Sequence, residues 1–528
     1  MVAEARHAFE TEDYGQAIRL YTKLLGLAEG KDKQQSLEML GVSREFNGQL
    51  AHARNYYKTY LQEYPGTSGA ERVQQRLAAL LALEQPQKKQ LKQLVRRNPD
   101  SWRINSHFSQ FYQRHSLTVD NNSSVPINGL FNDFNLMAFK DGNSLNQEAR
   151  ITMSYLADFT DEDRLKGREL QISSAYWEGF SDRLNSGIKI GRQSRLGSGV
   201  PGRFDGAAYT YRITSNLGVD LTGGFLVDSS FDSPDSNRPF VGVSGEYVSN
   251  SGNVTIEPFF MQQYIDGILD RRAIGAQVQL FSKRAMIYTL LDYDLYHSAL
   301  NNLTVTGNFR FRGSQISGSI QHRKSPYLTT RNALIGQQFE DLSEMEKAIL
   351  DLQLEDIASD RTATSNTIRL GFNTRLSEQW TITADVVATD FSNTESSANV
   401  IALESNQTLY SSFQLRSTDI FGHASYSALM LRHTNSDSAS TTSLYFDNRF
   451  SLGDYWRIYP RIRIDQRTFE RNGDEQLSIR PTLRIEYRRS SRFRFQIEAG
   501  YQKTTREMIS RDLDISGLFV RVGYRASF

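Results

Sequence analysis

The chain has 528 residues, with 61 Lys and Arg against 60 Asp and Glu, a net charge of +1 and no cysteine. The balanced charge argues against general nucleic-acid binding, and the lack of cysteine excludes disulfides and thiolate metal sites. A hydrophobic content of 39% and a mean hydropathy of -0.51 exclude a helical membrane protein, because no run approaches the ~20 apolar residues of a spanning helix.

Residues 1–85 show helical periodicity and an internal repeat of about 34 to 36 residues, typical of tetratricopeptide (TPR) helices. The repeat positions are Leu40, Gly41, Ala53, Tyr57, Leu61 and Pro65, preceded by Asp13, Tyr14, Ala17, Tyr21 and Leu25. Two repeats bury too little core alone, so we expect the end of a longer solenoid, acting as a protein-binding groove or as a spacer. The opening MVAEARHAFE lacks the apolar segment of a signal peptide, which fits a sequence starting inside a longer exported protein.

A basic linker is predicted over residues 86–104. Its cations are Lys88, Lys89, Lys92, Arg96 and Arg97. A solvated helix face and a docking surface both fit this charge pattern.

From about residue 105 to Phe528 the pattern changes to strands, in which apolar and polar residues alternate. Alternation places successive side chains on opposite faces, and a membrane barrel needs an apolar outer face and a polar inner face. Short turns alternate with longer loops at 195–204, 229–238, 392–406, 434–440, 469–475 and 504–514. We therefore predict an α+β protein of two domains, in which the helical repeats precede an antiparallel transmembrane β-barrel of about 20–22 strands, or of as few as about 16–18.

The last four strands carry arginines on the face opposite their apolar residues. The predicted pore-lining arginines are Arg457, Arg461, Arg463, Arg467, Arg480, Arg484, Arg488, Arg492, Arg494, Arg521 and Arg525. Acids with the same inward phase are predicted between residues 217 and 296, namely Asp220, Asp228, Glu246, Glu257, Asp292 and Asp294. These inward charges have two possible roles. Opposed charged walls would orient charged solutes by a transverse field, or arginine–carboxylate pairs would stiffen the barrel wall.

The connection at 326–362 is unusually long, and its residues 332–359 are predicted to be helical. The predicted gate residues are its acids Glu340, Asp341, Glu344, Glu346, Asp351, Glu355 and Asp356. A barrel of this size encloses a lumen wide enough to need a plug, and the arginines offer the acids a counter-surface. We expect a gate that enters the lumen or covers its mouth, with a solvated external helix as the alternative.

The sequence predicts no enzymatic activity, cofactor or metal site. The eight histidines are scattered, and no cysteine nucleophile exists. Asp292 and Asp294 lie two apart on one strand face, as a hydrolase pair would, but a charged pore lining is the favoured interpretation. The glycine-rich stretch at 191–206 joins two strands and opens no helix, so we predict a constriction-shaping loop rather than a phosphate cradle.

A TPR array followed by a porin barrel resembles the outer-membrane exporters of bacterial biofilm exopolysaccharides. The resemblance is carried by the repeat from Leu40 to Pro65 and by the terminal row Val520, Val522, Tyr524 and Phe528, which departs from the usual outer-membrane signal at Ala526. The predicted strand number favours the PelB-like class over the exporters of cellulose and poly-N-acetylglucosamine. The resemblance implies a cationic amino-sugar polymer as substrate, a periplasmic polymer-modifying enzyme bound by the repeats, and a small PelC-like lipoprotein ring below the barrel.

We expect a barrel in the lipid bilayer of the bacterial outer membrane, with a periplasmic N-terminal domain, and, from the balanced charge, no nucleic-acid partner. Two other functions stay open. One is a substrate-specific uptake porin or receptor, and the other is an outer-membrane enzyme that uses Asp292 and Asp294.

Overall fold

The computed structural model describes residues 1–84 except 12, 29, 48 and 66, and residues 101–528 except 143, 161–168, 196–198, 201, 350–352, 423–424 and 509–511. Most of the predicted linker, with Lys88, Lys89, Lys92, Arg96 and Arg97, lies outside the described residues. The chain divides into two compact units, Met1–Ser101 and Trp102–Phe528. No helix within the described ranges is long and apolar enough to cross a membrane.

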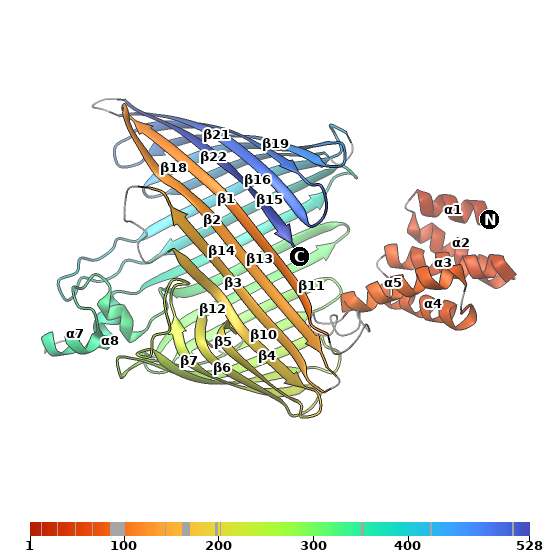
Figure 1. Ribbon diagram of the computed structural model, residues 1–528, viewed down its shortest axis with the longest axis horizontal. Coiled ribbons are helices and arrows are strands. Elements are labelled where there is room, and N and C mark those ends of the chain that lie inside the picture. Colours follow the sequence, from red (N-terminus) through yellow and green to blue (C-terminus); the bar gives the residue numbers. More distant parts are fainter. Residues whose placement is uncertain are drawn as a thin grey trace. The chain divides into compact units, whose positions relative to one another are not determined.

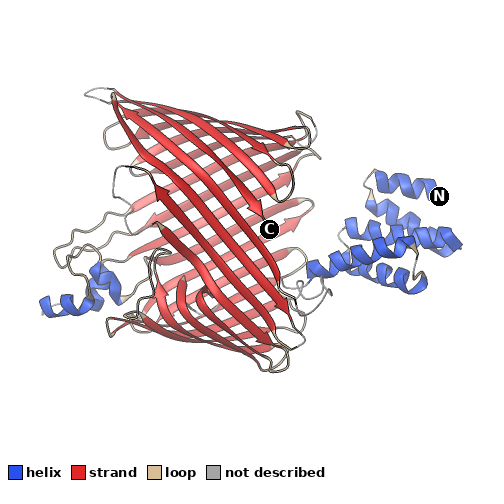
Figure 2. Cartoon of the chain, in the orientation of Figure 1, coloured by secondary structure: helices blue, strands red, loops and turns tan. Residues whose placement is uncertain are grey.

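The first unit is a row of five helices, in which each helix packs against the next (Figure 2). Their bounds are α1 Val2–Glu10, α2 Tyr14–Leu27, α3 Gly30–Phe46, α4 Leu50–Glu63 and α5 Ser68–Glu84. Predicted repeat positions form part of the buried core, since Leu40, Ala53 and Tyr57 are fully buried. A Cβ at Gly41 of α3 would lie 2.5 Å from Tyr57 Cε1 of α4, so glycine permits the close approach of these two helices.

These few helices establish a helical unit and do not by themselves establish the repeat solenoid that the sequence predicts. Helix pairs of this kind need only an apolar stripe and a small residue where they cross, as at Gly41. The repeat pattern is therefore compatible with any short stack of helices, and the TPR interpretation is finer than the structure supports.

The second unit is one antiparallel sheet of 22 strands closed on itself (Figure 1). The strand number confirms the upper end of the predicted range. Consecutive strands pair in chain order, and β1 also pairs with β22 along most of its length. The bounds are β1 Arg103–Val119, β2 Asn122–Asp141, β3 Asn146–Asp158, β4 Leu170–Ser181, β5 Ser186–Ser194, β6 Arg203–Arg212, β7 Leu217–Val227, β8 Pro239–Val248, β9 Val254–Ile265, β10 Ile268–Phe281, β11 Ala285–Asp294, β12 Ala299–Phe311, β13 Ser314–Ser325, β14 Ala363–Arg375, β15 Trp380–Phe391, β16 Asn406–Thr418, β17 Tyr426–Ser436, β18 Ala439–Leu452, β19 Trp456–Phe469, β20 Glu475–Tyr487, β21 Phe493–Glu507 and β22 Leu513–Ser527.

The predicted alternation separates an apolar outer face from a polar inner face. Leu483 of β20 and Leu518 of β22 point outward and are 46% and 52% exposed on the isolated barrel. Such a band of exposed aliphatic side chains is stable only when lipid covers it. Arg521, in the opposite phase of β22, lies over the ring of Phe111 of β1 on the inner face. A closed barrel with these two faces is the form in which β-strands span an outer membrane.

The two ends of the barrel differ in their connections. One end, the turn end, carries short connections such as 282–284 and 312–313, and the other, the loop end, carries the longer ones at 195–202, 228–238, 326–362 and 392–405. The loop predicted at 434–440 is wrong, because β17 continues to Ser436 and β18 begins at Ala439. Beyond the lipid both faces of a strand meet water, so a polar run there is compatible with strand structure.

The connection between β13 and β14, residues 326–362, forms a compact lid instead of the single helix predicted at 332–359. It contains the 3₁₀-helix η2 (Thr330–Leu334) and the α-helices α7 (Leu342–Ala348) and α8 (Leu354–Asp360). Gly336 interrupts the helical pattern with a φ of 74°, and the Asp341 side chain starts α7 by accepting a hydrogen bond from Glu344 N at 2.7 Å. α7 and α8 lie beyond the strand ends, at the loop end (Figure 1).

Candidate functional site

The predicted arginines are brought together on one inner surface at the C-terminal end of the chain. The strands place Arg457, Arg461, Arg463 and Arg467 on β19, Arg480 and Arg484 on β20, Arg494 on β21, and Arg521 and Arg525 on β22. Cross-strand partners share the inward phase, as where Arg463 lies opposite Arg480 and Arg494 opposite Arg525. The same surface continues onto Arg449 of β18 and Arg432 of β17, and we call the whole set the arginine wall. Arg488 and Arg492 lie in the β20–β21 connection, not on a strand.

Acids within the wall neutralise some of these arginines. Arg461 Nε lies 3.0 Å from Asp447 Oδ1, and Asp465 Oδ2 lies 2.7 Å from Arg463 Nε and 3.8 Å from Arg480 Nη2. Arginine–carboxylate pairs of the kind predicted as the alternative are therefore present in this part of the surface.

Other arginines of the wall lie over aromatic rings. Arg484 lies 4.0 Å from the ring centre of Tyr459, and Arg432 lies between the rings of Tyr410 and Tyr445, at 5.8 and 5.3 Å. An aromatic face holds a guanidinium in place without cancelling its charge. In the part of the chain that the structure describes, Arg432, Arg484 and Arg521 form no ion pair, so the wall keeps a net positive charge.

A smaller acidic surface occupies the inner face of β7, β8 and β9. Its members are Asp220, Glu246 and Glu257, which lie close enough for their charges to interact. Asp220 is paired with Arg195, at the start of the β5–β6 connection, so the surface is partly neutralised. The lumen thus has the opposed charges that the sequence predicts, with the positive side much the larger.

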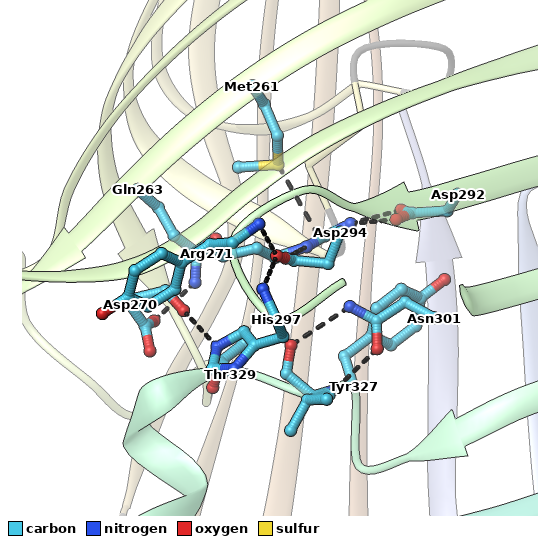
Figure 3. A network of polar contacts seen from close by, with 12 residues as sticks. Met261, Gln263, Asp270, Arg271, Asp292, Asp294, His297, Asn301, Tyr327 and Thr329 are labelled. Carbon is cyan, nitrogen blue, oxygen red and sulfur yellow. Dashed lines mark hydrogen bonds and ion pairs between the residues drawn. The ribbon is translucent and has the colours of Figure 1, made fainter. Parts of the chain in front are cut away.

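Asp292 and Asp294 do not line the open lumen, which corrects their predicted role. Both are almost fully buried on β11, and both contact the guanidinium of Arg271 on β10 (Figure 3). Arg271 Nη2 donates to both oxygens of Asp292, and its Nε lies 3.4 Å from Asp294 Oδ2. Because both carboxylates are almost fully buried around this guanidinium, a substrate has no access to them, which a hydrolase dyad would need.

Arg271 is a functional candidate that the sequence did not predict. Its Nη1 lies 3.4 Å from Gly199 O in the β5–β6 connection, and its guanidinium lies 5.2 Å from the ring centre of Tyr327 in the lid. The signal was present, because Arg271 shares the inward phase of β10 with Ala273 and Gln277. A bulge between Leu269 and Arg271 obscures the alternation at this point.

Val200 of the β5–β6 connection belongs to an apolar patch on the inner wall. Val200 packs with Phe204 of β6, Leu226 of β7, Phe240 of β8, Met261 of β9 and Ala273 of β10. The strand side chains of this patch point into the barrel and yet are buried, so Val200 lies on their lumen side. The structure thus places Gly199 and Val200, two residues of the predicted constriction-shaping loop, against the inner wall.

The lid is attached to the loop ends of β9 to β12. Leu342, Met345 and Ile357 form one buried cluster with Ile265 at the end of β9. Asn301 of β12 holds the lid backbone, because its Oδ1 accepts from Leu328 N at 2.8 Å and its Nδ2 donates to Leu328 O at 3.1 Å. The lid is therefore a packed part of the barrel and not a solvated helix.

The predicted gate acids do not reach the arginine wall. Glu340, Glu344, Glu346 and Asp356 are exposed on the lid, Asp341 caps α7, Glu355 accepts a hydrogen bond from Tyr296, and Asp351 lies outside the described residues. No described lid acid forms an ion pair with an arginine of the wall. The lid does not fill the lumen as a plug, because its apolar stripe packs against Ile265 at the loop end of β9.

Two ionisable contacts join the lid to the β7–β8 and β11–β12 connections. Burial, followed by the hydrogen bond to Glu355, raises the pKa of Tyr296 to about 12, so this phenol stays a donor at neutral pH. Asp228, predicted as an inward acid, instead follows the end of β7 and pairs with Arg331 of the lid and with Arg238 at 2.7 Å. Burial alone would raise the pKa of Asp228, but the two guanidinium groups outweigh it and lower the pKa.

Among the described residues, no group of three or more His, Asp or Glu side chains is placed to hold a metal ion.

Comparisons with known proteins give the following findings. No family model and no curated protein matches the chain. Solved structures match at low similarity. Pseudomonas aeruginosa OpdK with vanillate has 10% identity and a TM-score of 0.36, over 80% of this chain and 99% of that chain. A BenF-like porin from Pseudomonas fluorescens Pf-5 has 11% identity and a TM-score of 0.35, over 81% and 99%. Acinetobacter baumannii OccAB2 has 8% identity and a TM-score of 0.38, over 80% and 98%.

These findings correct the predicted identification. No TPR or PelB-like family model matches, and the structures that do match are outer-membrane channels such as the BenF-like porin. Three further predictions followed only from the resemblance and are wrong with it. They are the exopolysaccharide substrate, the periplasmic modifying enzyme and the PelC-like ring. The generic repeat and terminal motifs explain the error, because any helical stack before any outer-membrane barrel would carry them. What stands is coarser: the chain forms a closed antiparallel β-barrel of 22 strands with the two faces expected of an outer-membrane barrel.

Proposed function

We propose that this chain is an outer-membrane channel for the uptake of small solutes, with a lumen that favours anions. The observation that carries the proposal is the arginine wall, in which Arg432, Arg484 and Arg521 keep their charge while aromatic rings hold them. In this proposal the loop end faces the outside, and the turn end and the helical unit face the periplasm.

The physical basis is the field of a charged wall in a narrow aqueous space. A wall that carries one sign of charge, enclosed by a low-dielectric shell, concentrates counter-ions near it by about tenfold or more. Guanidinium groups also match the planar, two-oxygen geometry of carboxylates, so small carboxylates are the solute class that fits best. Several weak sites along a wall permit passage, whereas one tight site would trap the solute.

Ion selectivity in planar bilayers tests the proposal. The parent channel should give reversal potentials in a potassium chloride gradient that correspond to anion preference. The triple variant Arg432→Gln, Arg484→Gln, Arg521→Gln should reduce the anion-to-cation permeability ratio by roughly threefold or more, and the effect should shrink in high salt because the Debye length falls to about 3 Å at 1 M.

The matched control keeps the charge. In the variant Arg432→Lys, Arg484→Lys, Arg521→Lys the permeability ratio should stay close to that of the parent. Liposomes should also swell faster in a small sugar acid than in the neutral sugar of the same size. Cation preference in the parent, or equal ratios in the Gln and Lys variants, would overturn the proposal.

A further inference from the structure

We propose that Arg271 is a positioning residue of this channel: it holds the β5–β6 connection inside the barrel at Gly199 and Val200, and so limits the size of the solutes that pass. The inference rests on the proposed channel function and adds to it the residue that sets the width of the lumen.

The first step is that the connection takes up lumen space. Phe204, Met261 and Ala273 lie on the inner phase of their strands and are fully buried. An inner-wall side chain of a wide barrel is buried only if another part of the chain lies on the lumen side of it. Val200 belongs to the same cluster, which extends over β6 to β10, so the connection narrows the barrel on this side.

The second step is that the fit at Gly199 is close. A Cβ at Gly199 would lie 2.3 Å from Phe259 Cδ2 on the inner face of β9, and the φ of Gly199 is 73°. Only glycine combines this backbone conformation with direct contact between the backbone and the ring. The connection therefore rests against the wall at one defined point.

The third step is that a charged group ties this point to the wall. Arg271 Nη1 is directed at Gly199 O at 3.4 Å and at Met261 Sδ at 3.6 Å. Asp292 and Asp294 hold the other side of the guanidinium (Figure 3). A fully buried guanidinium is held by its hydrogen bonds and cannot move away into solvent.

The fourth step is that Arg271 is also supported from the lid. Its guanidinium lies over the Tyr327 ring, and the Tyr327 hydroxyl accepts a hydrogen bond from Asn302 Nδ2 at 2.7 Å. Asp270, next to Arg271, accepts from Arg331 N of the lid at 2.9 Å and from Gln263 Nε2 at 2.5 Å. The position of Arg271 is thus fixed by β9, β11, β12 and the lid before it reaches Gly199.

The test uses a single cysteine as a reporter, because the chain has none of its own. In the Val200→Cys protein a membrane-impermeant maleimide should react slowly, since Val200 is buried in the cluster. Removing Arg271 alone would leave two uncompensated carboxylates and endanger folding, so the informative variant is Arg271→Met, Asp292→Asn, Asp294→Asn. Its labelling at position 200 should be about tenfold faster or more, because the loss of a hydrogen bond from a charged group frees the connection.

A second readout measures size without charge. Liposomes that contain the triple variant should admit larger neutral sugars than liposomes that contain the parent, and single-channel conductance should rise. The matched control is Arg369→Met, Asp385→Asn, which removes an inner-wall pair of β14 and β15 in which Arg369 Nη2 lies 2.7 Å from Asp385 Oδ1. The control should change neither labelling nor the sugar size limit.

A folded triple variant with the labelling rate and size limit of the parent would overturn the inference, as would equal changes in the control. Heat-modifiable mobility on unheated gels establishes that each variant is folded. Because neutral sugars and a maleimide report on the connection and not on ion selectivity, a channel without anion preference would overturn the proposed function and leave these results to decide the role of Arg271.

Discussion

Phe528, the last residue of the chain, and Ser106 of β1 exchange two backbone hydrogen bonds: Phe528 N donates to Ser106 O at 2.8 Å, and Ser106 N donates to Phe528 O at 3.1 Å. These bonds end the ladder between β1 and β22. Just before them, the ring of Tyr524 contacts Phe108 of β1 and Phe493 of β21 on the outer face. The last apolar row of the chain therefore covers the line along which the barrel closes, where open backbone groups would be costly in lipid.

Deletion of Phe528 should reduce the amount of folded barrel, because it removes two backbone hydrogen bonds from the closing ladder, each worth about 0.5–1.5 kcal/mol. The folded fraction is read from the mobility shift between unheated and heated samples. Phe528→Tyr keeps the backbone bonds and an aromatic ring, so it should behave like the parent. Parent-like folding of the deletion variant would show that closure does not depend on the last residue.

Local patterns predicted the barrel well. Apolar and charged residues alternate along each strand, as at Ile462 and Arg463, and this alternation determines which face of the sheet each residue occupies. A sheet with an apolar face and a charged face is stable in a membrane only as a closed barrel, so the pattern also predicted closure. The arginine wall came from the same periodicity. The aromatic partners of the wall did not, because Tyr459 meets Arg484 of the next strand only in the final register.

Contacts between segments that are distant in the chain could not be predicted from the sequence. Gly199 lies 72 positions from Arg271, and neither residue type indicates the other as partner. The acids of the lid suggested a partner for the arginine wall, yet the apolar stripe at Leu342 and Met345 decided where the lid packs. Water solvates a charged side chain at almost any surface position, whereas an apolar stripe needs an apolar partner. The apolar pattern therefore predicts the packing position of the lid better than its charges do.

Asn301→Ala should loosen the lid without unfolding the barrel. The substitution leaves the buried N–H and C=O of Leu328 without the two hydrogen bonds that Asn301 provides, at a cost of about 1–3 kcal/mol for each group left unpaired. Tryptic cleavage after Arg361, which is buried in the lid, should become faster, as measured by mass spectrometry of timed digests. Asn308→Ala, on the same strand near the turn end, is the control, and equal cleavage of both variants would contradict this account of the lid.

The attachment of the lid at Asp228 should weaken in acid. Pairing with Arg238 and Arg331 overcomes the effect of burial and holds the pKa of Asp228 below its usual value, so the folded state binds this proton less readily than the unfolded state. The contribution to stability is therefore complete above about pH 4, the ordinary aspartate range, and is lost as the pH falls through the lowered pKa. Above pH 5 no change from this group is expected.

A fluorophore on Glu346→Cys, an exposed lid position, reports this change. Its anisotropy should fall as the pH drops below about 4, the ordinary aspartate value. Asp228→Asn should lower the anisotropy at neutral pH and remove its response to acid, whereas Glu340→Gln, on the exposed side of the lid, should leave the titration unchanged. A titration that is the same in the Asp228→Asn variant would assign the acid response to another group.

Two glycines of the helical unit provide a matched pair. Gly41→Ala should destabilise the unit by about 1–3 kcal/mol, because its Cβ would lie 2.5 Å from Tyr57 Cε1 and force α3 and α4 apart. Gly26→Ala, in α2, meets no atom within 4 Å and should stabilise the unit by roughly 0.5–1 kcal/mol through helix propensity alone. Urea unfolding of the full chain in detergent, followed by circular dichroism at a helical wavelength, should move the midpoint in opposite directions for the two variants. A shift of both midpoints in the same direction would mean that the close approach at Gly41 does not limit the packing of these helices.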